Sequence, residues 1–158
     1  MKNVHRIIDQ LLFLIDNIPG EFRHMSELEI SQRPAPQKWS KKEMLGHLCD
    51  SAINNLDRFI KIQYEKQPFL LTPYDQVHWV KIQGYQELPF DEVMNQWVSL
   101  NKKIIYVLKN IPNEKLALQC GFENNQLITL QWLIQDYLDH MEHHLKQIFK
   151  MNEQILNL

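Results

Sequence analysis

Residues 135–148 read QDYLDHMEHHLKQI and contain three of the seven histidines in this 158-residue chain. Apolar residues recur through this stretch at intervals of three and four, which predicts an α-helix with one face in the protein core. Two side chains four residues apart on such a helix lie on the same side, about one turn apart along the axis. A pair of imidazoles at this spacing can bind one metal ion, as the two histidines of an HExxH helix do.

The helical wheel distinguishes the three histidines of this stretch. His144 falls inside the apolar arc and His140 at its edge, whereas His143 falls outside it, on the polar side. Because an unpartnered imidazole in a core is costly, a pair directed at the core favours a bound ligand over a solvated face. We expect this helix to begin after Thr129, which is its N-cap, and to extend as far as Asn157.

Composition excludes several classes of protein. The net charge of −2 and the sequence pI near 6.4 provide no basic surface for nucleic acid. The sequence contains no run of about eighteen apolar residues, so no membrane-spanning helix is predicted. The N-terminal residues lack the apolar segment and cleavage site of a signal peptide. The two cysteines, Cys49 and Cys120, form neither a disulfide framework nor a CxxC motif. We therefore expect one cytoplasmic domain, residues 1–158, without nucleic-acid or membrane partners.

Seven prolines divide the chain into four long proline-free segments. Helices avoid interior proline, since it removes a backbone donor and clashes with the preceding turn. The sequence therefore predicts an all-α fold, a four-helix bundle with long connections. The four helices are expected at residues 2–17, 41–66, 90–110 and 130–157. Pro19 ends the first helix, short helices are expected near residues 26–30 and 74–83, and residues 114–127 are expected to be irregular, with Cys120 in a turn.

The second helix has a strong start signal and carries a polar stripe. Ser40 and Glu43 form a capping box, because the serine oxygen accepts from a first-turn amide and the glutamate reaches back. His47 heads a stripe of polar side chains that fall close together on the wheel: Ser51, Asn54 and Arg58. This stripe is either a solvated face or the lining of a pocket between helices, where Gly46 would permit close approach of a neighbour.

Two motifs together resemble those of the DinB/YfiT-like superfamily. The first, residues 39–48, reads WSKKEMLGHL, and the second, residues 136–148, reads DYLDHMEHHLKQI. The resemblance extends along nearly the whole chain. Members of this superfamily are four-helix bundles in which one histidine of the second helix and an HxxxH pair of the fourth bind a divalent metal, commonly zinc or nickel.

The resemblance implies that His47, His140 and His144 are the metal ligands and that the stripe at His47 faces a pocket. Three neutral imidazoles leave at least one open position on a zinc-like ion, as in catalytic sites. Asp50 and Asp136 each lie about one helical turn from a histidine, so each can orient that histidine through its second ring nitrogen. Each is equally well placed as a charge on a helix surface.

Several other side chains have two open interpretations. Arg58 can hold an anionic substrate or a thiol cofactor, or it can form a salt bridge within its own helix or with another. His143 is expected in solvent, with an outer role at the metal as the alternative, and His78 can reach a pocket or simply pack. The wheel places Cys49 in the core, whereas the turn expected at Cys120 leaves that thiol free at the surface.

Two functions are consistent with the resemblance. The first is a metal-dependent enzyme, a thiol S-transferase or a hydrolase, that acts on a small molecule and uses water or a low-molecular-weight thiol at the open position. The alternative is a non-catalytic, metal-binding and dimerising bundle protein of a stress response. Superfamily members often pair, so a homodimer is expected from the resemblance alone. DNA binding is disfavoured by the charge of the chain.

Overall fold

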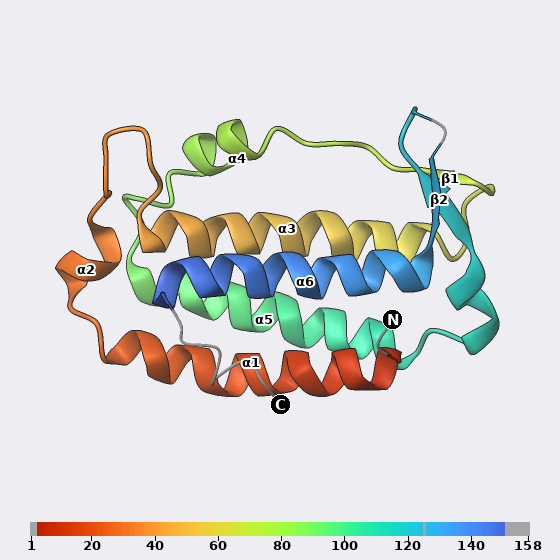
Figure 1. The fold of residues 1–158 in the computed structure, drawn as a ribbon, viewed down its shortest axis with the longest axis horizontal. Helices are drawn as coiled ribbons and strands as arrows, with labels where there is room; N and C mark the ends of the chain where they lie inside the picture. Colours follow the sequence, from red (N-terminus) through yellow and green to blue (C-terminus); the bar gives the residue numbers. More distant parts are fainter. Residues whose placement is uncertain (1–2, 125, 151–158) are drawn as a thin grey trace.

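Four long helices form the body of the protein in the computed structural model, which describes residues 3–124 and 126–150 (Figure 1). They are α1 (Val4–Arg23), α3 (Lys41–Lys61), α5 (Phe90–Lys109) and α6 (Leu130–Phe149). Both α1 and α3 pack against α5 and α6, so α1 and α3 lie diagonally across the bundle. The predicted all-α four-helix bundle is confirmed.

The connection between α3 and α5 is long because these two neighbouring helices run in the same direction, opposite to α1 and α6 (Figure 1). The chain must therefore return along the whole bundle before α5 begins. Residues 62–89 make this return along the outside of α3, and they include the short strand β1 (Phe69–Leu70) and the helix α4 (Gln76–Gln83). The short helix expected near residues 74–83 is thus present, and it packs on α3.

A small three-stranded sheet closes the end of the bundle where α6 begins. The 3-10 helix η1 (Asn113–Ala117) leads into the strand β2 (Gln119–Gly121). This strand pairs in parallel with β1 and antiparallel with β3 (Leu127–Thr129). The expectation that residues 114–127 are irregular is therefore wrong. Strands of two or three residues are too short to show an alternating pattern, and the partner strand β1 is distant in sequence.

The first helix ends later than its proline suggests. Pro19 lies inside α1, which continues to Arg23, so the prediction that Pro19 ends this helix is wrong. Phe22 is buried, and its ring contacts those of Phe90 and Phe149, with centroids 5.0 and 4.9 Å away. Continuing the helix buries this aromatic ring, and the free energy gained by that burial offsets the loss of the single hydrogen bond that a proline removes. The short helix α2 (Glu27–Ser31) follows, as expected near residues 26–30.

The starts of α3 and α6 match the sequence signals. Ser40 Oγ accepts a hydrogen bond from the Glu43 amide, and the Glu43 carboxylate accepts one from the Ser40 amide, which completes the capping box. Thr129 caps α6 as expected. However, α3 ends at Lys61 and not at residue 66. Just after this end, the carbonyl of Ile62 accepts a hydrogen bond from Gln67 Nε2. The expected extension of the last helix to Asn157 lies outside the described residues.

The core of the bundle is apolar, with large side chains from all four long helices that are fully buried, among them Trp97, Phe22 and Phe59. One buried polar contact crosses it, where Tyr137 OH donates to Asn101 Oδ1 over 2.7 Å. None of the helices within residues 3–124 and 126–150 combines the length and apolar character that crossing a bilayer requires.

Replacing Ser40 by Ala tests the start of α3. The variant loses the acceptor for the Glu43 amide and the donor to Gln86 Oε1, so we expect the free energy of unfolding to fall by about 1–2 kcal/mol in urea denaturation. Ser26→Ala removes the same kind of cap from the short exposed helix α2 and should cost about 0.5 kcal/mol or less. Equal losses in the two variants would contradict this account of α3.

Candidate metal centre

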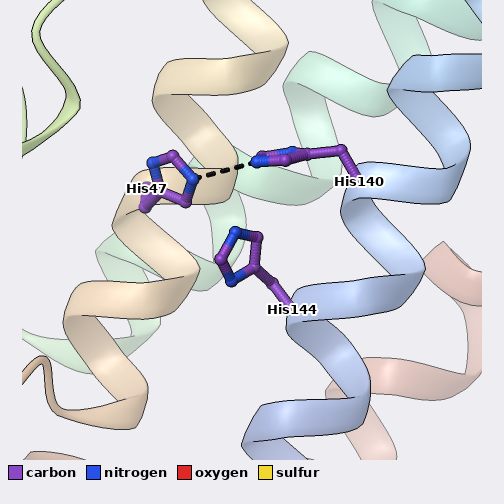
Figure 2. Close-up of side chains that lie close together, drawn as sticks. All are labelled: His47, His140 and His144. Atoms are coloured by element: carbon purple, nitrogen blue, oxygen red, sulfur yellow. Dashed lines mark hydrogen bonds between the residues drawn. The ribbon is translucent and has the colours of Figure 1, made fainter.

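Three histidine rings meet between α3 and α6 (Figure 2). His47 comes from α3, and His140 and His144 come from successive turns of α6. Their ring centroids lie 4.6 to 5.0 Å apart, and each ring stands roughly edge-on to the other two. The Nε2 atoms of His47 and His140 are 3.1 Å apart. The sequence therefore identified three residues that the fold brings together, although His47 and His140 are 93 positions apart.

These histidines are shielded from solvent to different degrees. His47 is completely buried, so its position on a solvated face, one of the two interpretations of the polar stripe, is excluded. Burial, reinforced by any positive charge on His140 and His144, lowers the pKa of His47 to about 3. Burial likewise lowers the pKa of His140 to about 4 and lowers that of His144. All three rings are therefore neutral near pH 7, the form in which imidazole binds a metal.

Gln147 fixes which nitrogen of His144 is available. Its Oε1 lies 2.9 Å from His144 Nδ1 and can only accept, so Nδ1 carries the proton and Nε2 keeps a free lone pair. The amide nitrogen of Gln147 lies 3.2 Å from Nε2 of the exposed His143. His143 is thus in solvent as expected, and it meets the site both through Gln147 and by an edge-on contact with the His144 ring, whose centroid lies 5.2 Å from its own. A glutamine three residues after a histidine on a helix is a signal that the sequence analysis did not use.

The other two rings have weaker support at their second nitrogen. His140 Nδ1 lies 3.4 Å from Ser51 Oγ, and Asp136 makes no hydrogen bond to this ring. His47 Nδ1 is buried without a hydrogen-bond partner among the described residues. Of the two alternatives left open for Asp50 and Asp136, the structure therefore does not show the one in which they orient these two histidines. Asp50 lies about one turn along α3 from His47, but its Oδ1 accepts hydrogen bonds from Tyr85 and Gln83.

The three rings fit a divalent ion. One ring nitrogen from each lies within 4.8 Å of the other two. A tetrahedral zinc with bonds of about 2.0–2.1 Å separates its ligand atoms by about 3.3 Å, so the 3.1 Å pair already matches and small ring rotations would bring in the third. Without a metal the two adjacent Nε2 atoms share one N–H···N hydrogen bond, whereas a cation would use the lone pairs of both.

The position of His47 depends on aromatic packing. The Trp39 ring lies 5.0 Å from the His47 ring and tilts 36° from it. Gly46, the residue directly before His47, lies against the Tyr85 ring so closely that an added Cβ would overlap its carbons. The expected close approach at Gly46 is thus observed, and the neighbour is Tyr85 from the connection between α4 and α5. That connection has no helical period, so nothing in the sequence singled out Tyr85.

Asp50 is a buried anchor for this connection. Its Oδ1 accepts hydrogen bonds from the Tyr85 hydroxyl at 2.7 Å and from Gln83 Nε2 at 2.5 Å. Burial raises the pKa of Asp50, although these two donors oppose the rise. Asp50 is therefore neither a surface charge nor a partner of His47. It ties the end of α4 and the residues after it to α3 beside the histidines.

A cavity of about 190 Å³ opens beside the histidine cluster. It is lined by side chains of α3 and α6, of the connection after α3, and of the loop between β2 and β3, including Ser51, Arg58, Tyr74, Phe122, Asp136 and His140. The polar stripe of α3 thus lines a pocket for part of its length. Asn54 instead donates to the backbone of Asp50 and lines a neighbouring cavity with Arg58.

The remaining side chains of interest lie away from the histidines. His78 is exposed and pairs with Asp75 over 2.8 Å, so it does not reach the site. Cys49 is buried in the core as expected. Cys120, however, is fully buried in β2 and not a surface thiol in a turn, and burial raises its pKa to about 11. Asp57 forms a salt bridge with Lys61 over 2.9 Å and not with Arg58, its neighbour in sequence.

A four-helix bundle with three histidines that can hold a metal between its second and fourth long helices defines a class of protein. Comparison with protein families matches residues 10–148 to the DinB superfamily, and the chain belongs to that superfamily. The superfamily resemblance carried by the two sequence motifs is thereby confirmed.

Two relatives share most of their length with this chain. A protein of Halalkalibacterium halodurans, named "Putative metal-dependent hydrolase BH0277", is 24% identical over 147 residues, which cover 93% of this chain and 85% of the relative. A similarly named protein of Bacillus mycoides is 26% identical over 153 residues, which cover 94% of this chain and 87% of the relative.

Two solved structures from Bacillus subtilis have the same fold. One is YfiT, described as "a probable metal-dependent hydrolase with an unusual four-helix bundle topology". It superposes with a TM-score of 0.83 at 18% identity, and the superposition covers 93% of this chain and 84% of YfiT. The DinB-like protein YjoA superposes with a TM-score of 0.58 at 17% identity, over 91% of this chain and 88% of YjoA.

Replacing Gly46 by Ala tests the packing beside His47. The new methyl group overlaps the Tyr85 ring, so we expect a loss of about 1–3 kcal/mol in the free energy of unfolding, measured by urea denaturation. Gly20→Ala is the matched control, because nothing lies within 4 Å of its Cβ and helical alanine is favoured by about 0.5–1 kcal/mol. A Gly46→Ala variant as stable as Gly20→Ala would refute the close contact.

Replacing Gln147 by Ala tests the orientation of His144. Without the acceptor at Nδ1, the ring loses its preferred tautomer, so the affinity for zinc should fall about tenfold in a competition titration with a chromophoric chelator. Gln147→Glu keeps an acceptor and should restore most of that affinity. His143→Ala removes the far end of this contact and an edge-on ring contact with His144 but leaves the acceptor at Nδ1, and it should change the affinity less than about threefold. An unchanged affinity in Gln147→Ala would rule out this role.

Proposed function

We propose that this protein is a metal-dependent enzyme that acts on a small molecule, with one zinc or nickel ion held by His47, His140 and His144. The observation that carries the proposal is the convergence of three neutral ring nitrogens beside a cavity. The relatives named as metal-dependent hydrolases support the same class of protein.

The reaction we propose is hydrolysis or the transfer of a low-molecular-weight thiol. A divalent ion with an open position lowers the pKa of water or a thiol there, so that either becomes a nucleophile near neutral pH. The chain contributes three uncharged ligands, since burial keeps the imidazoles unprotonated. Trp39 covers one side of the His47 ring, and the cavity next to His140 provides the space for the substrate.

The number of nearby ligands favours this function over a structural metal. Structural zinc sites are usually closed by four protein ligands, whereas catalytic sites have three. In the part of the chain that the structure describes, His47, His140 and His144 form a group that no further His, Cys, Asp or Glu joins. This supports an open position and speaks against the alternative of a non-catalytic bundle that uses its metal for stability.

Metal content tests the ligand assignment. Purified protein incubated with excess zinc or nickel and then dialysed should retain about one ion per chain by elemental analysis. His144→Ala should lose the ion, since two imidazoles alone bind far more weakly, whereas His143→Ala should retain it because His143 is exposed and outside the group. Full occupancy in His144→Ala would refute the assignment.

Turnover tests the catalytic part of the proposal. The metal-loaded protein should hydrolyse activated esters or conjugate small thiols to electrophiles, and chelation should lower the rate at least about a hundredfold. His47→Ala should lower it similarly, with a circular dichroism spectrum as the check on folding. If the loaded protein bound its ion fully but accelerated no reaction in either panel, the non-catalytic alternative would be favoured.

A further inference from the structure

We propose that Arg58 binds a carboxylate of the substrate, so that the substrate class is small organic acids that present their reacting group to the three histidines. The reacting end of this inference rests on the proposed function. The carboxylate site itself does not, because it depends only on Arg58 and its surroundings.

Arg58 is held by its neighbours without a counterion. Its Nη2 donates to the Thr72 carbonyl over 2.9 Å, and its guanidinium lies 5.9 Å from the Tyr74 ring centroid and 5.8 Å from that of Phe122. Within residues 3–124 and 126–150, no carboxylate lies within 4.0 Å of it. The structure thus does not show the alternative of a salt bridge, and two segments distant in sequence from α3, residues 72–74 and the loop at Phe122, meet at a cation with unused donors.

The chemistry of this group fits a planar anion. A guanidinium has five N–H donors in a plane and matches the two oxygens of a carboxylate in a bidentate arrangement. The carbonyl of Thr72 uses one of those donors, and the rings of Tyr74 and Phe122 lie near the cation, where aromatic groups favour a partly desolvated charge. Arg58 is partly buried, and this burial lowers its pKa.

The site is continuous with the histidine cluster. Arg58 and His140 line the same cavity of about 190 Å³, with Ser51 between them on the α3 wall. His47 and Arg58 are separated by eleven positions on α3, or about 16 Å along the axis. Because Arg58 and the histidines lie on different turns of α3, we expect a ligand that reaches both to be elongated, with several methylene groups rather than two carbons.

Asp136 opposes an anion in the same cavity. It is exposed on α6 and lies outside ion-pair distance of Arg58. Burial and the nearby Asp139 raise the pKa of Asp136, whereas Arg58 lowers it. Removing its charge should therefore strengthen the binding of a carboxylate, and removing the charge of Arg58 should weaken it. These opposite effects distinguish an anion site from a purely structural arginine.

The test compares acids with alcohols of the same length. Cobalt-substituted protein is titrated with 6-mercaptohexanoate and with 6-mercaptohexanol, and binding is followed by the thiolate-to-cobalt absorption band. We expect the acid to bind about tenfold more tightly than the alcohol, a ratio that falls to about one in Arg58→Gln and rises in Asp136→Asn. The preference for the acid should be smaller for the pair 3-mercaptopropionate and 3-mercaptopropanol. Arg6→Gln, which removes an exposed arginine of α1, is the matched control and should leave the ratio unchanged.

A second measurement separates this inference from the proposed metal function. Hexanoate and hexanol are titrated into metal-free protein, and the Arg58 Nε–H resonance is followed by NMR. A shift with hexanoate alone supports the carboxylate site even if no cobalt band forms, in which case only the metal function fails. An equal NMR response to hexanoate and hexanol would overturn the inference. So would an acid-to-alcohol ratio that Arg58→Gln does not change, or binding of the cationic thiol cysteamine that is tighter than binding of 3-mercaptopropionate.

Discussion

Three uncharged imidazole rings packed against one another between α3 and α6 are the feature on which the rest of the site depends. Burial and mutual proximity lower the pKa values of His47 and His140 to about 3 and about 4, so both rings are neutral at pH 7, and without a metal their Nε2 atoms share one N–H···N hydrogen bond of 3.1 Å. A divalent cation would replace that hydrogen bond, because it accepts a lone pair from each ring. The bundle thus builds a site that favours metal over protons.

The surroundings of these rings follow from the order of the helices. Since α3 and α5 run in the same direction, the chain must return along α3, and this return supplies side chains that the four helices alone cannot. Tyr85 packs on Gly46 and binds buried Asp50, next to His47, while Tyr74 lies beside Arg58 further along the same helix. The long connection that the topology requires therefore supplies part of the lining of the candidate site.

Much of this arrangement could be predicted from the sequence, for physical reasons that also mark the limit. Capping at Ser40 and an i, i+4 histidine pair are local, so the helix starts and the pairing of His140 with His144 were readable. The end of α1 was not, because tertiary burial of Phe22 outweighs the local effect of a proline. Two features near the site were also missed. Tyr85, which anchors Asp50, comes from a connection without periodicity, and the three-stranded sheet depends on pairing between distant short segments.

The most direct test of the metal centre is an anomalous difference map from a crystal of the zinc-loaded protein. We predict one peak between α3 and α6, about 2.0–2.1 Å from a ring nitrogen of each of His47, His140 and His144, with a non-protein atom completing the coordination. A map without a peak there, or one in which zinc binds elsewhere while the His47 ring remains uncoordinated, would contradict the account.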